Sequence, residues 1–99
     1  MKVKKITYPD SLENYNKDKD NIDVFVELEN GENYCVVVAT IRWIQEIIKN
    51  GYLEQSLPFI IVDEINEELI KKAIENYAQG NAYWLKVYAL SCNQKLKLD

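Results

Sequence analysis

The pair Asn30-Gly31 constrains the fold of this chain more than any other feature. It separates two strand-like stretches, 22–29, in which polar and apolar residues alternate, and 32–39, which ends in an apolar run. Asn-Gly tolerates positive φ at both central positions of a turn, so the pattern predicts a β-hairpin with a two-residue type I′ loop. A loop of that length fixes the register, and it predicts a buried Cys35 opposite Val26.

This register divides the hairpin into two faces. The predicted core face carries Ile22, Val24, Val26, Leu28, Cys35, Val37 and Ala39. The predicted outer face carries Asp23, Phe25, Glu27, Glu29, Glu32, Tyr34, Val36 and Val38. The outer face is therefore expected to be apolar at one end and acidic toward the turn.

The rest of the chain predicts a small sheet with two helices. Residues 3–8 favour a first strand, and the apolar run 59–62 is typical of a strand that is covered on both faces or lies centrally in the sheet. Thr40 predicts the N-cap of a helix through Asn50, and Asn66 predicts the N-cap of a second helix. Residues 81–90 favour a last strand, with a third helix as the alternative.

The predicted order of elements is thus β-β-β-α-β-α-β. A hairpin followed by helices indicates the α+β class, with a mainly antiparallel sheet and both helices packed on one of its faces. The 99 residues, 47% of them apolar, are enough for a single domain with one core. Within it, the polar stretch 10–21 predicts a flexible loop, and 91–99 predicts a frayed tail.

The length of the apolar runs and the number of cysteines indicate the cellular compartment of the protein. No apolar run has the length of a membrane span or a signal peptide, so we expect a cytoplasmic protein without membrane contact. Cys35 and Cys92 are too few for a disulfide framework, which also favours a reducing compartment. They could pair or react, but no neighbouring feature indicates a lowered thiol pKa.

The sequence contains no histidine, which argues against most catalysis. Histidine is the commonest general base near neutral pH and the commonest transition-metal ligand. Asp18, Asp20 and Asp23 lie close together, but their loop lacks the glycine turn and the terminal glutamate of an EF-hand. No phosphate-binding or dinucleotide-binding glycine motif occurs. We therefore expect neither an enzyme nor a bound metal or cofactor.

Acidic residues are concentrated in the middle of the chain. Residues 10–68 hold 14 Asp and Glu against four Lys and Arg, a net charge of −10, whereas each flank carries +3. A surface of this kind repels nucleic acid and attracts a basic protein.

Two acidic clusters are the candidate contacts for a basic partner. The first, on the outer hairpin face, comprises Phe25, Glu27, Glu29, Glu32, Tyr34 and Val36. The second comprises Asp63, Glu64 and Glu67 at the turn before the second helix. Apolar anchors rimmed by charge are typical of an interface. The plainer alternative is a solvated acidic surface, and acids before a helix also stabilise its N-terminus. Trp43 and Trp84 are expected in the core, with a place in a binding interface as the alternative, for which Trp43 would be half exposed beside Arg42.

Residues 22–80 resemble a group of small acidic bacterial α+β domains, some of which are like immunity proteins that neutralise a toxin. The shared features are the hairpin sequence Asp23-Val24-Phe25-Val26-Glu27-Leu28-Glu29-Asn30-Gly31, then Thr40, Gly51, the strand 59–62 and the helix after Asn66. The resemblance implies an inhibitor-like domain whose acidic face occludes a basic partner, for example a toxin or nuclease. The alternative is an accessory or structural domain that self-associates through the exposed hairpin edge and a patch of Phe25, Tyr34, Val36 and Val38. In either case we expect a monomer or a weak homodimer.

Overall fold

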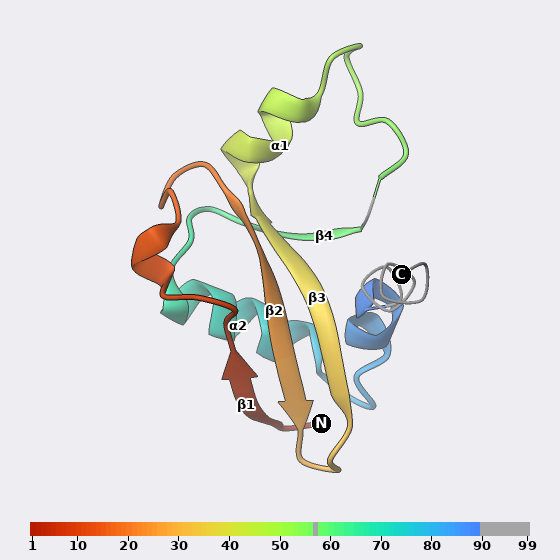
Figure 1. Cartoon of the computed structure of the whole chain (residues 1–99). Coiled ribbons are helices and arrows are strands. Elements are labelled where there is room, and N and C mark those ends of the chain that lie inside the picture. Colours follow the sequence, from red (N-terminus) through yellow and green to blue (C-terminus); the bar gives the residue numbers. More distant parts are fainter. Residues whose placement is uncertain (57, 90–99) are drawn as a thin grey trace, which may run out of the picture.

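The computed structural model describes residues 1–56 and 58–89 and shows an α+β fold (Figure 1). Its elements, in chain order, are β1 (Val3–Thr7), the 3-10 helix η1 (Leu12–Asn14), β2 (Asn21–Leu28), β3 (Asn33–Thr40), α1 (Ile41–Ile47), β4 (Phe59–Val62) and α2 (Glu67–Tyr77). Residues 83–89 are also helical. The four strands form one sheet in the order β1-β2-β3-β4.

The sheet is mixed, which corrects the expectation of a mainly antiparallel sheet. β2 pairs antiparallel with both β1 and β3, whereas β4 pairs parallel to β3. The pairing is parallel because α1 and the segment after it carry the chain from the end of β3 back along the sheet. β4 therefore starts beside Val37 and runs in the same direction as β3. The hairpin β2–β3 therefore lies in the middle of the sheet and has no free edge.

The hairpin exists as predicted, but its turn is of another type. Gly31 N–H donates to Leu28 O at 2.9 Å, and Leu28 N–H donates to Glu32 O at 2.9 Å. These bonds enclose a three-residue loop in which Gly31, at φ +88°, has positive φ and Asn30 does not. This geometry is that of a type I turn followed by a glycine bulge. The predicted two-residue type I′ loop is wrong.

The extra loop residue shifts the register by one position. Cys35 lies opposite Phe25, and Tyr34 lies opposite Val26. Because neighbouring residues of a strand point to opposite faces, every β3 side chain changes face relative to the prediction. Val36 and Val38 are buried in the core, whereas Cys35, Val37 and Ala39 share the other face with Phe25.

The main core lies between the inner face of the sheet and the helices behind it (Figure 1). It comprises Ile22, Val24, Val26, Leu28, Val36, Val38, Ile60, Val62, Ile65, Ile70, Ile74, Ala78, Ala82, Leu85 and Ala89. The buried stripe of α2 follows the predicted helical spacing, and Asn66 caps the helix by accepting Leu69 N–H at 3.1 Å.

α1 does not share a face with α2, so the prediction of two helices on one face is wrong. Thr40 caps α1 as predicted, but the helix ends at Ile47 rather than continuing through Asn50. The ring of Trp43 contacts the ring of Phe59 edge to face, with centroids 5.4 Å apart. Phe59 points away from the core face, which Ile60 occupies, so α1 packs toward the outer face.

The last predicted strand is a helix instead. Residues 83–89 are helical, and Leu85 and Ala89 are buried beside Ala78 and Ala82 in the core. The sequence 83–89 fits both a strand and a helical period, and packing against α2 decides between them. This segment, together with α2, covers the inner face of the sheet.

Residues 10–21 form a hydrogen-bonded loop. Asn16 Oδ1 accepts the backbone N–H groups of Asp18 and Lys19, and the Asp20 carboxylate accepts Asn16 N–H. Ile65 N–H donates to Lys17 O at 2.7 Å, which joins the loop to the segment before α2. The flexibility of this loop stays a prediction, and the predicted frayed tail lies outside the described residues.

Candidate functional site

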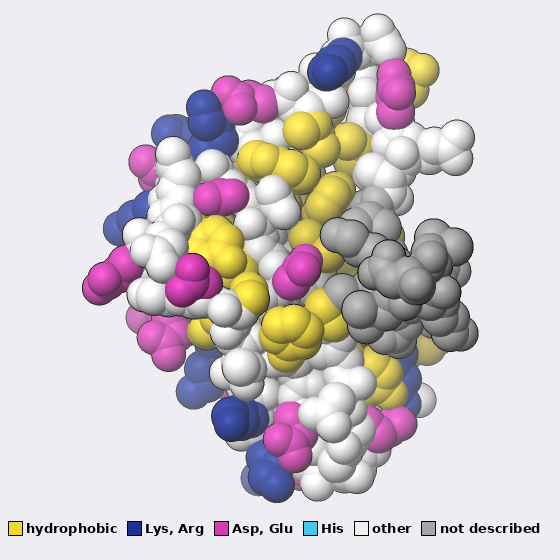
Figure 2. Space-filling model, viewed as in Figure 1, with side chains coloured by type: hydrophobic (Ala, Val, Ile, Leu, Met, Phe, Trp, Pro, Cys, Tyr) yellow, Lys and Arg dark blue, Asp and Glu magenta, His cyan; other side chains and the backbone are white. Residues whose placement is uncertain are grey.

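The outer face of the sheet is the candidate site, because it leaves large apolar side chains exposed. Phe25 on β2 is 44% exposed and Ile61 on β4 is 52% exposed. The register places Phe25 beside Cys35, and Ile61 beside Ala39. Figure 2 shows hydrophobic side chains across this face, with acidic side chains among them. The inner face, by contrast, is filled by the main core.

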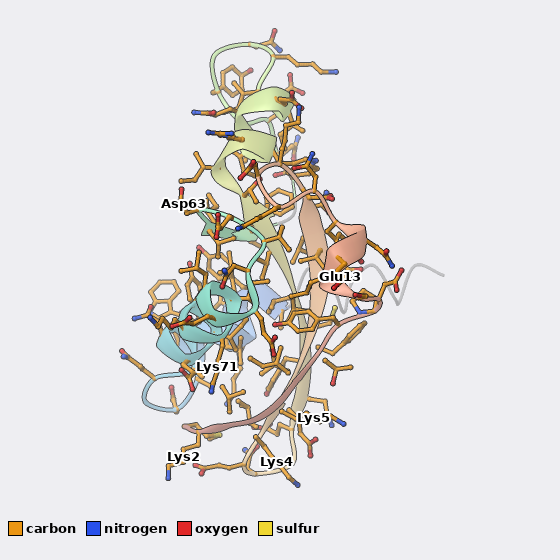
Figure 3. All side chains as sticks on the ribbon, turned by 90° about the vertical axis from the view of Figure 1, so that its left-hand side faces the viewer. Lys2, Lys4, Lys5, Glu13, Asp63 and Lys71 are labelled. Carbon is orange, nitrogen blue, oxygen red and sulfur yellow. The ribbon has the colours of Figure 1, made fainter. Side chains whose placement is uncertain are left out.

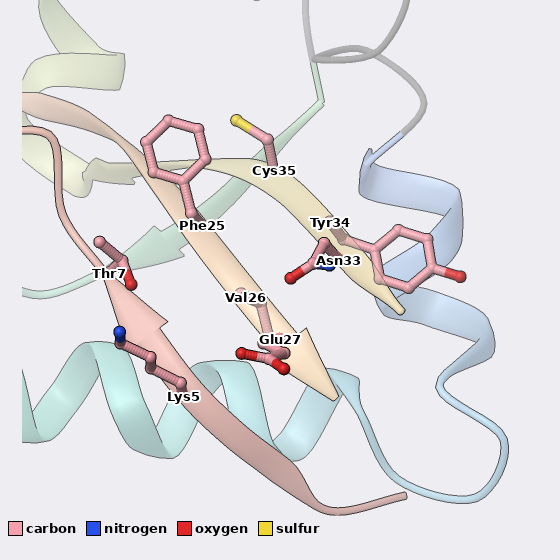
Figure 4. A pocket seen from close by; sticks show the side chains of 8 residues that line it. All are labelled: Lys5, Thr7, Phe25, Val26, Glu27, Asn33, Tyr34 and Cys35. Carbon is pink, nitrogen blue, oxygen red and sulfur yellow. The ribbon is translucent and has the colours of Figure 1, made fainter. Parts of the chain in front are cut away.

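A shallow cavity of about 360 Å³ lies at the β1 side of this face. Its lining residues are Lys5, Thr7, Phe25, Val26, Glu27, Asn33, Tyr34 and Cys35 (Figure 4). Phe25, Thr7 and Cys35 form its apolar end, and Lys5, Glu27 and Asn33 form its polar end. The surface thus offers one aromatic anchor beside groups of both charges.

Charge on the outer face is mixed rather than purely acidic. Asp23 is part-exposed and lies opposite Val37 on this face. Glu27 lies 3.6 Å from the ammonium group of Lys4, with Lys5 opposite it on β1. Exposed pairs of this kind contribute little to stability, about 0–1 kcal/mol. None of the ion pairs among the described residues includes Asp23, which lies two residues from Phe25 on β2.

The predicted hairpin site is only partly assembled. Phe25 and Glu27 do lie on the outer face. Val36 is completely buried on the inner face, so it is not available to a partner. Tyr34 also belongs to the inner face, where it packs against the core and points toward the helical segment in Figure 4. The one-residue register shift accounts for both corrections.

Glu29 and Glu32 lie at the hairpin turn. Glu32 accepts hydrogen bonds from the Asn30 amide at 2.6 Å and the Tyr34 hydroxyl at 3.1 Å, and the Lys86 ammonium lies 3.9 Å away. The Asn30 hydrogen bond, followed by that of Tyr34, lowers the pKa of Glu32. The Glu32 carboxylate is therefore already bound by neighbouring side chains of this protein at the turn.

The second predicted cluster, Asp63, Glu64 and Glu67, lies far from the turn. It follows β4, whose Val62 pairs with Thr40 at the end of β3 opposite to the turn. Figure 3 shows Asp63 well separated from Lys4 and Lys5. Glu64 lies 3.7 Å from the Lys17 ammonium, and Glu67 is in the first turn of α2. The two predicted acidic clusters therefore do not form one surface.

Sequence reasoning missed Ile61 because an uninterrupted apolar run predicted a strand covered on both faces. Ile60 and Val62 are buried, but Ile61 points outward and is exposed. Phe59 shares that outward side and contacts Trp43. The sequence held no signal for this exposure, because β4 is four apolar residues without alternation and the early end of α1 at Ile47 is seen only in the structure.

Cys35 is buried, as predicted, with 7% of its surface exposed, but it lies beside Phe25 rather than Val26. The other cysteine of the sequence, Cys92, lies outside the described residues.

Metal-ligating clusters and membrane-spanning helices are both absent from residues 1–56 and 58–89. No group of His, Cys, Asp and Glu side chains there could hold a metal ion. None of the helices there is long and apolar enough to cross a membrane. Comparison of the chain with protein-family models, with curated proteins and with solved structures finds no match.

Proposed function

We propose that this protein is a small inhibitor-like binding domain whose outer sheet face covers a basic surface of a partner protein. The observation that carries the proposal is the joint exposure of Phe25 and Ile61 on a face whose opposite side is fully packed. Exposed apolar side chains rimmed by charge are the usual anatomy of an interface.

The chemistry of the partner is inferred from charge. Residues 10–68 carry a net charge of −10, and Asp23 lies within the apolar part of the face. Negative charge beside an apolar anchor favours a lysine- or arginine-rich partner and speeds its encounter. A basic toxin or nuclease whose active site is covered in this way would be neutralised by occlusion, which requires no catalytic group in this chain.

The proposal predicts which substitutions abolish binding. Immobilised protein is used to retain basic proteins from the source cell, and the affinity of the retained protein is then measured by calorimetry. Phe25→Thr with Ile61→Thr should weaken binding at least tenfold, because central apolar anchors contribute most of the affinity. Tyr52→Thr is the control, since Tyr52 is also exposed but belongs to the segment between α1 and β4 and not to a strand of the sheet.

The contribution of charge is measured separately. Asp23→Asn with Glu27→Gln should slow association and reduce its dependence on salt, with a smaller effect on dissociation. A partner that binds both double variants as tightly and as fast as the wild type would refute the outer-face model. Binding that survives with unchanged salt dependence would refute the charge argument alone.

Self-association is the second candidate, and one observation favours it. The hairpin edge proposed for it from the sequence does not exist, and Val36 and Val38 of the proposed patch are buried. However, β4, one of the two edge strands of the sheet, carries no charged side chain, whereas β1, the other edge strand, carries Lys4 and Lys5. Lysines protect a sheet edge against pairing, so β4 is the less protected edge. Light scattering would support this candidate by showing a dimer that Ile61→Lys converts to a monomer.

A further inference from the structure

An aromatic cavity lies on another part of the surface, between α2 and the helical segment 83–89. It has a volume of about 270 Å³ and is lined by Asn76, Tyr77, Trp84 and Tyr88. The rings of Tyr77 and Tyr88 meet edge to face, with centroids 5.0 Å apart and planes at 82°. Perpendicular rings turn aromatic faces in different directions, which is how aromatic side chains can surround a small group.

Trp84 has 58% of its surface exposed, so the expectation that it packs in the core is wrong. Its ring is contacted edge to face by the equally exposed Tyr83, at a centroid distance of 5.2 Å. Tryptophan and tyrosine are the side chains most enriched at binding sites, where the ring stays accessible and its orientation is supported by neighbours. Trp84 is therefore placed to contact a ligand in the cavity.

The cavity has aromatic walls, and the lysines nearest to it along the helices are directed at carboxylates. Lys72 lies 3.3 Å from Glu68, and Lys86 lies 3.9 Å from Glu32. Burial, followed by the hydrogen bond with Tyr88, raises the pKa of Tyr77, so this phenol is neutral at physiological pH. The walls thus present uncharged rings, whose faces carry negative potential.

We propose that this cavity binds an organic cation, a guanidinium or alkylammonium group held against the faces of Trp84, Tyr77 and Tyr88. Such groups are attracted by the ring quadrupole, most strongly by tryptophan. The cavity is slightly smaller than the roughly 300–1,000 Å³ of pockets for drug-sized ligands, which suits a single cationic group. This site is separate from the outer sheet face and does not depend on the function proposed for that face.

The test compares a cation with an uncharged molecule of the same shape. The full chain is titrated with choline and, separately, with 3,3-dimethyl-1-butanol, while the ring protons of Tyr77 and Tyr88 are followed by NMR. A cation–π site should prefer choline by about fivefold or more, which corresponds to the usual strength of that interaction. Equal binding of the two molecules would overturn the proposal. It would also be overturned if neither choline nor a short arginine peptide, titrated in parallel, changed the ring-proton signals.

Variants locate the site and separate two sources of the cation. Trp84→Leu should lose the preference for choline, Trp84→Phe should keep part of it, and Tyr52→Leu, an exposed position elsewhere, should leave it unchanged. Circular dichroism confirms that each variant is folded. A parallel titration with a short arginine peptide distinguishes a protein side chain from a free quaternary ammonium compound as the better ligand. Unchanged choline binding in folded Trp84→Leu would overturn the assignment of the cavity.

Discussion

The hydroxyl oxygen of Thr40 accepts the backbone N–H of Asp20 at 3.1 Å, where the loop 10–21 meets the end of β3. The same oxygen accepts the N–H of Trp43 at 3.2 Å and so caps α1. Thr40 N–H in turn donates to Asp20 O at 3.0 Å. One buried side chain therefore joins the loop, the central strand and the helix that leads to β4.

Thr40→Val should lower the free energy of unfolding by about 1–3 kcal/mol, because it removes a helix cap and leaves buried N–H groups without an acceptor. Thr40→Ser keeps the hydroxyl group and is the control, with a smaller loss from the missing methyl group. Urea denaturation followed by circular dichroism measures both variants. If Thr40→Val is no less stable than Thr40→Ser, the two hydrogen bonds do not stabilise this junction.

Gly31→Ala should cost about 1–2 kcal/mol of stability, since Gly31 has φ +88° and an L-residue is strained there. A Cβ at this position would meet no atom within 4 Å, so the cost comes from the backbone and not from a clash. Gly31→Asn should cost less, because asparagine tolerates positive φ. The comparison is made by chemical denaturation, and equal stability of the Ala variant and the wild type would contradict the bulged turn.

Phe25→Thr should change the free energy of unfolding by less than about 1 kcal/mol, because Phe25 is half exposed on the outer face. Val24→Ala, at the neighbouring buried position, should cost about 2 kcal/mol through lost burial and a cavity. Thermal and urea unfolding of the two variants test the assignment of faces. A larger loss for Phe25→Thr than for Val24→Ala would place Phe25 in the structural core and weaken its proposed role in binding.

Asn30→Ala should raise the pKa of Glu32, because the Asn30 amide is the largest cause that lowers it in the wild type. In the folded protein this pKa is below the ordinary value, so the associated stabilisation is present above the ordinary pKa. It is lost as the pH falls through the folded-state pKa. NMR titration of the Glu32 carboxyl carbon in both proteins measures the shift. An unchanged pKa in the variant would assign the effect to Tyr34 and Lys86 instead.

Local chemistry made several elements predictable from sequence. Thr40 and Asn66 cap helices through bonds to N–H groups three residues ahead, so the signal lies within a few residues. The apolar spacing of α2 likewise identified its buried stripe. The hairpin followed from a turn pair between two strands, and with it the placement of Phe25 and Glu27 on one face.

The register, by contrast, was decided by tertiary structure. Residues 35–39 of β3 are apolar without interruption and are buried on both faces, so alternation could not show which side chains face the core. Asn30-Gly31 suits both a two-residue and a three-residue loop, and local preference does not choose between them. Packing of Val36 and Val38 against the helices behind the sheet selects the longer loop.

The same holds for the candidate sites. Residues 83–89 satisfy a strand period and a helical period, and contact with α2 makes them a helix that exposes Trp84. Ile61 is exposed because the chain after β3 returns as an edge strand with little above it, which no pattern within β4 records. The sequence by itself determined the hairpin, the helix caps and the surplus of acid, since these depend on neighbouring residues or on composition. Which apolar side chains remain exposed depended on contacts between segments far apart in the chain, and only the tertiary structure decided it.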